Sequence, residues 1–316
     1  MTEFPSADAG SPHTPASPKS SSPGDRSLTR DVHPVSIRAI PGLRASHSPI
    51  DHELTVIIPA YNEAQRLPQT LRGLSDYLGQ WGVDYRVMVV DDGSSDGTSD
   101  LVAEWGSHFT VIRQPNGGKG SAVRNGMLRA TGRVVAFTDA DLPYDLDALR
   151  HGYDQIDDQS VEVVFGARDL RESTTTVSRR LARRLAHEVF RQCMRVLVSR
   201  EVGDTQCGLK IFSHRAAHEI FSRCVINGFA FDAEVVYLTH ALGLSFSRIS
   251  VTLVNEYATT ISLTRHALPM LGDVLALRWR ALTGRLNLHS PLLPEETMVV
   301  EPPVVEPLSA RRRKAA

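Results

Sequence analysis

Short apolar runs alternate with amphipathic helical patterns through the middle of this 316-residue chain. The apolar runs occupy residues 53–60, 85–92, 109–114, 133–141 and 161–168. Helical patterns follow the first four of them, over about 67–78, about 95–105, from about 119 and over about 146–156. Runs of this kind are typical of strands in a parallel sheet whose two faces are covered by helices. The pattern predicts an α/β fold with a mostly parallel central sheet flanked by helices.

The pattern changes after the fifth run. Amphipathic helices are expected over residues 177–199 and 264–286, and each has leucines on one face and arginines on the other. Between them we expect the segment 204–212, a helix over 232–242 and a strand over 248–257. Helices of this kind occur in ordinary protein cores, but basic charge beside leucine and aromatic residues is also typical of a helix on a membrane surface. The sequence leaves both interpretations open.

Both ends of the chain have a composition that cannot bury enough apolar surface to fold. Residues 1–50 are rich in serine, proline, aspartate and glycine, whereas residues 289–316 are rich in proline and finish with a basic run. We therefore expect a disordered N-terminal arm over 1–50, one folded domain over 51–288 and a flexible tail over 289–316.

Charge and cysteine content narrow the function classes. The net charge is −1 at pH 7, with no long basic face, so nothing indicates a nucleic-acid partner. The three cysteines lack metal-type spacing, which indicates a reducing compartment. No apolar run reaches about eighteen residues, the length of a membrane-spanning helix, and no signal-peptide pattern opens the chain. We expect a cytoplasmic protein, soluble or attached peripherally to the cytoplasmic face of a membrane.

Unusual loops follow each of the five apolar runs: PAYNE, DDGSSDGT, PNGGKG, DADLP and GARD. Ligands of open α/β sheets bind outside the carboxyl ends of the strands, so these loops are expected to form one site. Asp139 and Asp141 lie two residues apart and point to the same side of an extended chain. Two such carboxylates repel each other, and a divalent cation with oxygen ligands is the natural remedy. A solvated acidic turn is the alternative for this pair taken alone.

Other residues of these loops have simpler interpretations beside the functional one. Lys119 opens a predicted helix and could face an anion there, while the glycines before it are typical of a tight turn. Ser94, Ser95 and Asp96 suit a helix cap, and Asp91 at the strand end is a better candidate to hydrogen-bond a nucleobase.

Together these segments resemble the family 2 glycosyltransferases of the GT-A fold. The resemblance rests on VIIPAYNE, VVDDGSSDGT, GKGSAVRNG, FTDADLP, GAR and DTQCGLKIF, and it covers roughly residues 54–285. More narrowly, the combination of DADLP with DTQCG resembles the dolichyl- and polyprenyl-phosphate sugar synthases, especially the β-glucosyltransferase branch. The resemblance marks the folded domain over 51–288 as the catalytic domain.

The resemblance implies an inverting transfer of a hexose, glucose first of all, from a UDP-sugar to dolichyl or polyprenyl phosphate. The nucleotide sugar would be held by residues of four loops: Pro59, Tyr61, Glu63, Asp91, Lys119 and Asp139. It also implies that Mg²⁺ or Mn²⁺ joins Asp139 and Asp141 to the diphosphate. One position departs from the pattern of related mannosyl enzymes, because Pro143 stands where they have a metal-binding glutamine. This departure weighs against a mannose donor.

A lipid monophosphate needs no general base, since its second pKa is about 6 and it is largely dianionic at neutral pH. It needs cationic hydrogen-bond donors instead, and Arg168, Arg179 and Arg183 suit that task. Arg168 matches a phosphate-contacting arginine of the family, whereas a solvated helix face is the alternative for the other two. Asp204 and Gln206 are expected to shape the site.

Two other functions stay open at this point. The acceptor could be a saccharide or small-molecule hydroxyl, with Asp232 or Asp204 as the base, or the chain could be a non-catalytic nucleotide-sugar-binding module. Asp232 and Glu234 lie on a predicted buried helix, where we expect them to pair with arginines. A membrane surface or a membrane partner protein is an expected partner.

Overall fold

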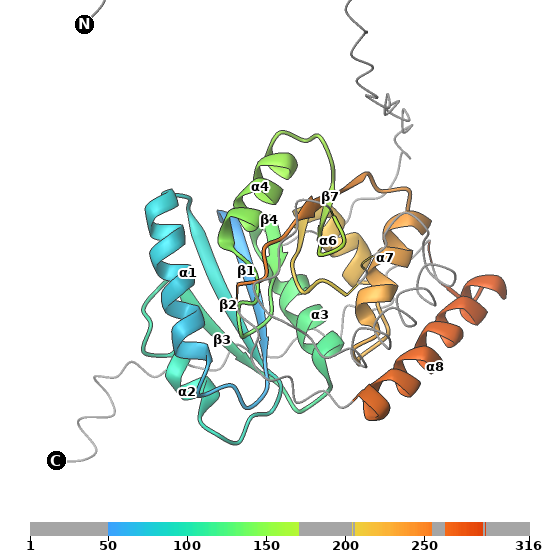
Figure 1. Ribbon diagram of the computed structural model, residues 1–316, viewed down its shortest axis with the longest axis horizontal. Coiled ribbons are helices and arrows are strands. Elements are labelled where there is room, and N and C mark those ends of the chain that lie inside the picture. Colours follow the sequence, from blue (N-terminus) through green and yellow to red (C-terminus); the bar gives the residue numbers. More distant parts are fainter. Residues whose placement is uncertain (1–49, 171–203, 205, 255–262, 287, 289–316) are drawn as a thin grey trace, which may run out of the picture. The chain divides into compact units, whose positions relative to one another are not determined.

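The computed structural model describes residues 50–170, 204, 206–254, 263–286 and 288. These residues form a seven-stranded sheet with the strand order β3-β2-β1-β4-β6-β5-β7 (Figure 1). The strands are β1 (His52–Ala60), β2 (Tyr85–Asp91), β3 (Phe109–Arg113), β4 (Gly132–Phe137), β5 (Val163–Ala167), β6 (Lys210–Ser213) and β7 (Phe246–Ser250). The expected α/β fold with a mostly parallel sheet is thereby confirmed.

One strand runs against the others. The pairs β1–β2, β2–β3, β1–β4 and β5–β7 are parallel, whereas β6 is antiparallel to both of its neighbours, β4 and β5. Its register places Lys210 beside Phe137 and Ser213 beside Val134. The start of β6 therefore lies beside the carboxyl end of β4, so the segment that leads into β6 reaches the edge of the sheet where Asp139 and Asp141 follow β4.

Helices cover both faces of the sheet, as the alternating pattern predicted (Figure 1). They are α1 (Leu67–Trp81), α2 (Thr98–Val102), α3 (Lys119–Arg129), α4 (Leu146–Asp157), α6 (His214–Phe221), α7 (Phe231–Ala241) and α8 (Leu263–Leu282). The core on one face joins the strands to α1 and α4, and the core on the other joins them to α3, α6 and α7. Side chains along a strand alternate between the cores: Val56 and Ile58 belong to the first and Ile57 to the second.

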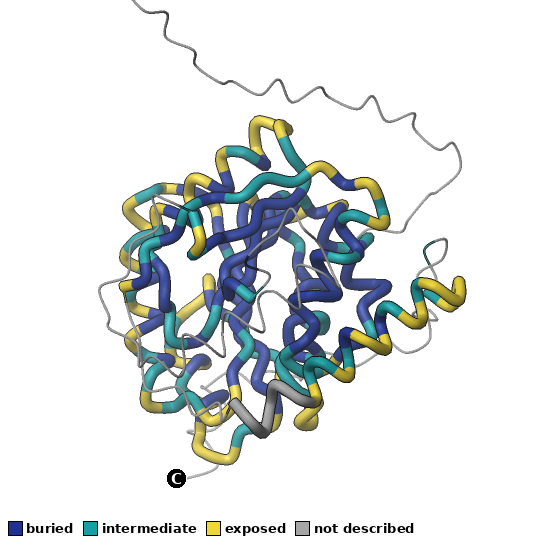
Figure 2. Tube along the Cα trace, turned by 45° about the vertical axis from the view of Figure 1, so that its right-hand side comes forward, coloured by how far each residue is buried: buried dark blue, intermediate teal, exposed yellow. Residues whose placement is uncertain are grey.

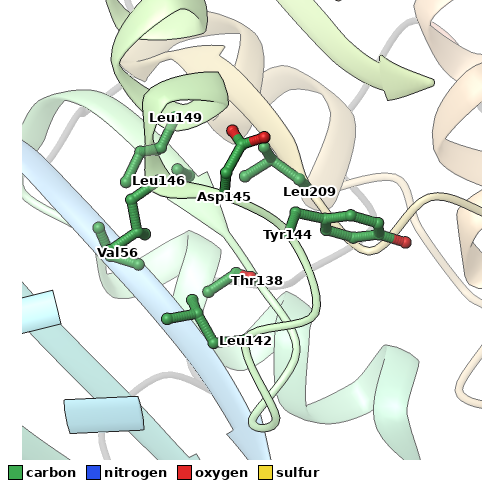
Figure 3. Close-up of a pocket in the computed structure, with 9 residues that line it drawn as sticks. Val56, Thr138, Leu142, Tyr144, Asp145, Leu146, Leu149 and Leu209 are labelled. Atoms are coloured by element: carbon green, nitrogen blue, oxygen red, sulfur yellow. The ribbon is translucent and has the colours of Figure 1, made fainter. Parts of the chain in front are cut away.

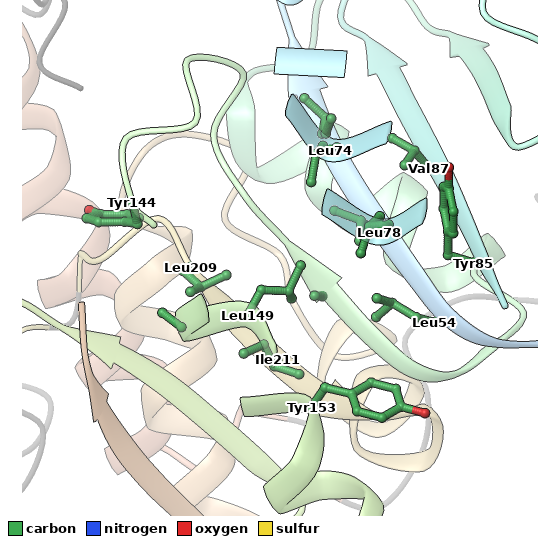
Figure 4. Close-up of a cluster of buried hydrophobic side chains, with 14 of the residues drawn as sticks. Leu54, Leu74, Leu78, Tyr85, Val87, Tyr144, Leu149, Tyr153, Leu209 and Ile211 are labelled. Atoms are coloured by element: carbon green, nitrogen blue, oxygen red, sulfur yellow. The ribbon is translucent and has the colours of Figure 1, made fainter. Parts of the chain in front are cut away.

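The first core is closely packed, with Leu74 and Leu78 of α1 over Val87 of β2, and Leu149 of α4 near Ile211 of β6 (Figure 4). Figure 2 shows the same result along the whole trace, because the strands are almost entirely buried while exposed residues recur on the outer sides of the helices. This rigid centre holds the ends of the strands in fixed positions.

Several elements differ from the sequence-based expectation. Helix α6 was not predicted, α2 is shorter than the expected 95–105, and β7 ends at Ser250 instead of near 257. The expected helix over 177–199, with Arg179 and Arg183, lies outside the described residues, as do residues 1–49 of the N-terminal arm and the whole tail over 289–316. No helix within the described ranges is both long and apolar enough to cross a membrane.

Candidate active site

The carboxyl ends of β1, β2, β4 and β5 gather charged residues at one edge of the sheet. Lys119, at the first turn of α3, forms an ion pair with Asp139, with 2.6 Å between Nζ and Oδ1. Burial alone would raise the pKa of Asp139, but the charges of Lys119, Lys210 and Arg168 outweigh it and hold this pKa below its usual value. Asp139 is therefore a carboxylate that the protein itself neutralises.

Asp141 has the opposite environment. Its side chain is partly buried, and both this burial and the charge of Asp139 raise its pKa above the usual value. Burial likewise raises the pKa of Glu63, and the charges of Asp141 and Asp139 add to the effect although Arg66 opposes it. Oε2 of Glu63 is buried without a hydrogen bond, and the nearest cation, Nη1 of Arg66, lies 3.5 Å away. Negative charge at Asp141 and Glu63 thus exceeds what nearby cations balance.

These residues fit a divalent cation. Among the described residues no three His, Cys, Asp or Glu side chains are grouped as a complete metal site. Mg²⁺, however, is commonly held by one or two carboxylates together with substrate phosphates and water, so an incomplete protein site is the expected form. Asp141, which forms no ion pair within the described part of the chain, would be the better ligand, and Asp139 would have to share its carboxylate with Lys119.

The backbone around the acidic pair is constrained. Leu142 has φ +42°, a left-handed conformation that bulky side chains rarely adopt, and its amide donates to the carbonyl of Asp139 at 3.1 Å. Asn62, in the loop after β1, also has a left-handed φ of +55°. Strained residues of this kind persist where the surrounding structure holds them, often at functional sites. The tight turn at Leu142 fixes where Asp141 lies.

Gly208 supports Asp139 from the other side. A Cβ atom on Gly208 would lie 2.0 Å from Oδ2 and 2.6 Å from Cγ of Asp139, well inside van der Waals contact. Only glycine leaves room for the carboxylate here. The segment that leads into β6 therefore packs directly on the acidic pair, and the glycine of the DTQCG motif is required by this approach.

Arg168 follows β5 and is clamped by Asp204. Its Nε donates to Oδ2 and its Nη2 to Oδ1 of Asp204, both at 2.7 Å, and its backbone amide also donates to Oδ2 at 3.1 Å. Asp204 is buried while Arg168 remains partly exposed. A planar guanidinium held by two parallel hydrogen bonds has a fixed orientation, with further N–H donors left for a ligand. Asp204 thus orients Arg168, which is one form of the expected site-shaping role.

Gln206 lies between the site and α8. Its Nε2 is 4.0 Å from the sulfur of Met270, a residue of α8. This contact places the middle of α8 beside the segment that carries Asp204 and Gly208.

Asp232 lies at the first turn of α7 and pairs with Lys210, not with an arginine as expected. Lys210 is 1% exposed, and it also donates to the carbonyl of Cys207 at 2.8 Å and lies 5.3 Å from the centre of the Phe137 ring. The expectation of an arginine partner was wrong for Asp232 because β6 places this lysine beside α7.

Glu234 differs as well, since it accepts hydrogen bonds from the backbone amides of Val225 and Ile226. Arg124 and Arg280 affect its pKa only as more distant charges. Glu234 therefore holds the loop before α7 in place. Asp232 and Lys210, by contrast, belong to the group of charges around Lys119 and Asp139.

The loops after β1 and β2 are joined to each other. The Asn62 amide donates to Oγ of Ser94 at 2.9 Å, the Ser95 amide donates to Oδ1 of Asn62 at 2.9 Å, and the Ala64 amide donates to Oδ2 of Asp96 at 3.0 Å. Oδ1 of Asp96 also accepts from the Thr98 amide that opens α2. The loop is thus held together by its own polar residues, but the helix cap expected of the two serines was wrong: Gly97 is the N-cap of α2 without a side-chain cap, and Ser94 and Ser95 bond to Asn62 instead.

Tyr61 and Asp91 have contrasting surroundings in the same region. Tyr61 is 52% exposed beside the partly buried Pro59, so its ring is accessible to a ligand. Asp91 is fully buried, and its two oxygens accept from the amide of Ser94 and the hydroxyl of Ser99. Nε of Arg113 also forms an ion pair with Oδ2 at 3.7 Å, beyond hydrogen-bond distance, so each oxygen still has a lone pair for another donor.

Two residues of this site were not singled out by sequence reasoning. Lys210 could have been noticed as a lysine inside an apolar strand pattern, GLKIF. Asp92 accepts from the amides of Gly117 and Gly118 at 2.8 Å and so orders the glycine loop before Lys119. No local signal in the sequence connects Asp92 to that loop.

A small cavity lies beside the turn that carries Asp139 and Asp141, since Thr138 and Leu142 both line it. It is lined mainly by apolar side chains, including Val56, Leu142, Leu149 and Leu209 (Figure 3). Both oxygens of the Asp145 carboxylate already accept hydrogen bonds, one from the backbone amide of Ala148 and the other from the backbone amide of Thr252. Because its lining is mainly apolar, this cavity offers little to a charged ligand.

Solved structures share this architecture. The mannosyl-3-phosphoglycerate synthase of Rubrobacter xylanophilus matches with a TM-score of 0.56 and 16% identity, over 77% of each chain. A glucosyl-3-phosphoglycerate synthase of Mycobacterium tuberculosis, solved with Mn²⁺, UDP and glucosyl-3-phosphoglycerate, matches with a TM-score of 0.53 and 17% identity, over 74% of this chain and 80% of the other. At such identities the likeness shows the fold, which is the GT-A fold of nucleotide-sugar transferases.

The sequence comparisons are more specific. The family model described as Glycosyl transferase family 2 matches residues 55–221, more than half of the chain. The chain belongs to this glycosyltransferase family. It is 32% identical over 283 residues to a dolichyl-phosphate beta-glucosyltransferase of Drosophila melanogaster, covering 84% of this chain and 86% of the relative. An enzyme of the same name from Dictyostelium discoideum is 29% identical, covering 82% of this chain and 84% of the relative. The one from Homo sapiens is also 29% identical, covering 75% of this chain and 78% of the relative.

Proposed function

We propose that this protein transfers glucose from UDP-glucose to dolichyl phosphate or another polyprenyl phosphate, with inversion at the anomeric carbon. Three curated relatives bear the name dolichyl-phosphate beta-glucosyltransferase, and each aligns with most of this chain. A solved structure of the same fold was obtained with Mn²⁺, UDP-glucose and phosphoglyceric acid. These likenesses support the reaction class, and the geometry of the charged site supports the kind of acceptor.

The surroundings of Asp232 are the observation that favours a phosphate acceptor over a hydroxyl acceptor. A hydroxyl acceptor must lose a proton as it attacks, so its enzyme needs a carboxylate that is free to take that proton. Asp232 is 4% exposed, pairs with the buried Lys210 and lies close enough to Lys119 to raise the pKa of that lysine. Asp204, the other candidate, is fully engaged by Arg168. Neither acid is available as a base, whereas a phosphate dianion needs none.

The acceptor phosphate is proposed to bind at Arg168. The clamp by Asp204 fixes the guanidinium plane and leaves N–H donors for phosphate oxygens. One oxygen of that phosphate attacks C1 of glucose, the bond between C1 and the UDP oxygen breaks, and the electron pair leaves with UDP. No proton moves in this step, so the chain has to orient two anions and balance their charge.

On the donor side, the exposed ring of Tyr61 and the remaining lone pairs of Asp91 are proposed to contact the nucleoside, with Pro59 and Glu63 forming the adjacent wall. Lys119 and the acidic pair face the diphosphate. Mg²⁺ or Mn²⁺, held by Asp141 and Asp139, would balance the charge that develops on UDP. Such a cation would also oppose the repulsion among these carboxylates, which adds to the effect of burial on the pKa values of Asp141 and Glu63.

A panel of acceptors tests the proposal. The purified full chain is given radiolabelled UDP-glucose, Mn²⁺ and either a short-chain polyprenyl phosphate, the matching polyprenol or a soluble saccharide. We expect label in a lipid product with the phosphate alone. Transfer to the polyprenol or the saccharide at a comparable rate would refute the phosphate acceptor, and UDP-glucose hydrolysis that no acceptor accelerates would refute the transferase proposal.

A further inference from the structure

Helix α8 has two apolar faces, and the described residues of the domain pack against only one of them. Val274 and Leu277 are buried in the core beside α7, and Arg278 lies 5.9 Å from the centre of the Tyr237 ring. These contacts fix the inner face of α8 against the domain. The helix is therefore attached on one side and free to present its other side.

The outer face carries large exposed apolar residues at helical spacing. Leu275 is 51% exposed, Trp279 is 63% exposed and Leu282 is 77% exposed. Spacings of four and three residues place the three side chains on one stripe, and about 100° per residue puts that stripe roughly opposite the buried one. Figure 1 shows α8 at the margin of the domain, and Figure 2 shows exposed residues recurring along it. Single exposed leucines are ordinary, but a stripe of three large apolar residues with a tryptophan marks an interaction surface.

Positive charge flanks this stripe. Residues 269–286 contain Arg278, Arg280 and Arg285 but one acid, Asp273. Arg280 and Arg285 are exposed. Arg280 is the chain neighbour of Trp279, and Arg285 follows the end of α8, after the left-handed turn at Gly284. Apolar residues with tryptophan, bordered by arginines, are typical of a helix lying in the surface of an anionic membrane.

The stripe also lies on the helix that borders the acceptor end of the site. Met270 of α8 contacts Gln206, which is close in sequence to Asp204 and hence to the clamped Arg168. Asp273 of α8 approaches Gly228, next to Asn227, whose carbonyl accepts from the amide of Ser121 in α3. The middle of α8 thus packs on the segment that carries Asp204 and on the loop that bonds to α3.

We infer that the stripe Leu275, Trp279 and Leu282, with Arg280 and Arg285 beside it, docks the protein on an anionic lipid bilayer. Apolar side chains enter the region between head groups and acyl chains, and the arginines contact lipid phosphates. The choice of a bilayer as the partner deepens the proposed function, because a polyprenyl phosphate keeps its tail in the membrane and brings its phosphate to the surface.

Vesicle binding of the full chain tests this inference. Vesicles of phosphatidylcholine with and without phosphatidylglycerol, and without any polyprenyl phosphate, are mixed with the protein and separated by flotation. We expect binding to the anionic vesicles. Replacing the stripe with serines (Leu275→Ser, Trp279→Ser, Leu282→Ser) should lower the partition coefficient at least about tenfold, since membrane binding scales with buried apolar area.

A matched control removes exposed apolar surface elsewhere. Ile50→Ser with Val254→Ser changes two side chains that are 56% and 46% exposed, and it should leave vesicle binding unchanged. Arg280→Gln with Arg285→Gln should reduce binding to anionic vesicles and leave the weak binding to neutral vesicles as it was. Equal binding of the serine variant and the wild type, with both folded by circular dichroism, would overturn the inference. So would equal losses in the serine variant and the Ile50/Val254 control.

The failure of this inference can be told apart from failure of the proposed function. Transfer to a water-soluble short-chain polyprenyl phosphate, without vesicles, should be the same in the serine variant and the wild type. Loss of this soluble activity in a folded serine variant would show that the stripe serves the reaction itself and would overturn the docking role. Vesicle binding by a protein that transfers glucose to no lipid phosphate would support docking and refute the proposed function.

Discussion

Gly208→Ala is expected to disable the site while keeping the fold. The new Cβ would lie 2.0 Å from Oδ2 and 2.6 Å from Cγ of Asp139, whereas carbon contacts are most favourable at about 3.5–4.0 Å. The carboxylate must therefore retreat by roughly 1 Å or more, against its ion pair with Lys119. A misplacement of about 1 Å in a catalytic constellation can cost about a hundredfold in rate. That factor corresponds to about 2.7 kcal/mol of transition-state stabilisation.

The assay is steady-state transfer from UDP-glucose to a short-chain polyprenyl phosphate, with thermal unfolding measured on the same samples. Over-packing at Gly208 should destabilise the protein by about 1–3 kcal/mol. Gly79→Ala is the matched control, because Gly79 lies exposed within α1 and a Cβ there meets nothing within 4 Å. This control should keep full activity and gain about 0.8–1 kcal/mol of stability. A folded Gly208→Ala protein with wild-type turnover would refute the claim that Gly208 positions Asp139.

Three further predictions concern the acidic pair, the arginine clamp and the N-terminal arm. Asp141→Asn should raise the melting temperature in metal-free buffer at pH 7. Burial and the charge of Asp139 raise the pKa of Asp141, so the ionised form of this side chain destabilises the fold. The wild type should therefore lose stability relative to the variant as pH rises from about 4. Mn²⁺ should then stabilise the wild type more than the variant, and equal stabilisation of both would count against Asp141 as a ligand. Arg168→Lys should raise the KM for the lipid phosphate about ten- to a hundredfold and leave the KM for UDP-glucose nearly unchanged. The reason is that lysine cannot keep both hydrogen bonds to Asp204. An unchanged KM for the lipid phosphate would contradict the acceptor role of Arg168. Deleting residues 1–49 should leave transfer to a soluble acceptor within a few-fold, since β1 begins at His52; a collapse of activity in a folded truncation would show that the arm serves the chemistry.

The positions of the loops followed from the sequence because parallel strands with a shared direction bring their carboxyl ends to one edge. Asp139 and Asp141 could be placed there from the apolar run that precedes them, and Arg168 from the run that ends at Ala167. These predictions needed only the local period of each segment and one topological rule.

The partners of the buried charges could not be predicted in the same way. Lys210 meets Asp232 only because β6 enters the sheet antiparallel beside β4, and a four-residue strand buried on both faces carries no signal of its direction. Composition favoured arginine as the partner of Asp232, but the chain placed a lysine there. Helix α6 was missed for a related reason, since its eight residues are too few for a clear helical period.

The two faces of α8 show another limit of sequence patterns. Val274 and Leu277 have the same kind of apolar side chain as Leu275 and Leu282, and the helical period alone does not say which pair faces the domain. Only the packing of α7 against α8 separates the covered face from the exposed one.

The central claim is that two anions meet at a cation-balanced site in which no protein carboxylate accepts a proton. The most direct test measures transfer from UDP-glucose to a short-chain polyprenyl phosphate by Asp141→Asn and Asp232→Asn side by side, after confirming that both are folded. Asparagine at 232 can still accept a hydrogen bond from Lys210, so we expect this variant to stay within about tenfold of the wild-type rate, whereas a missing general base typically costs about 10²–10⁴-fold. Asp141→Asn should lose nearly all activity. An inactive Asp232→Asn beside an active Asp141→Asn would contradict the account and assign Asp232 as a base for a hydroxyl acceptor.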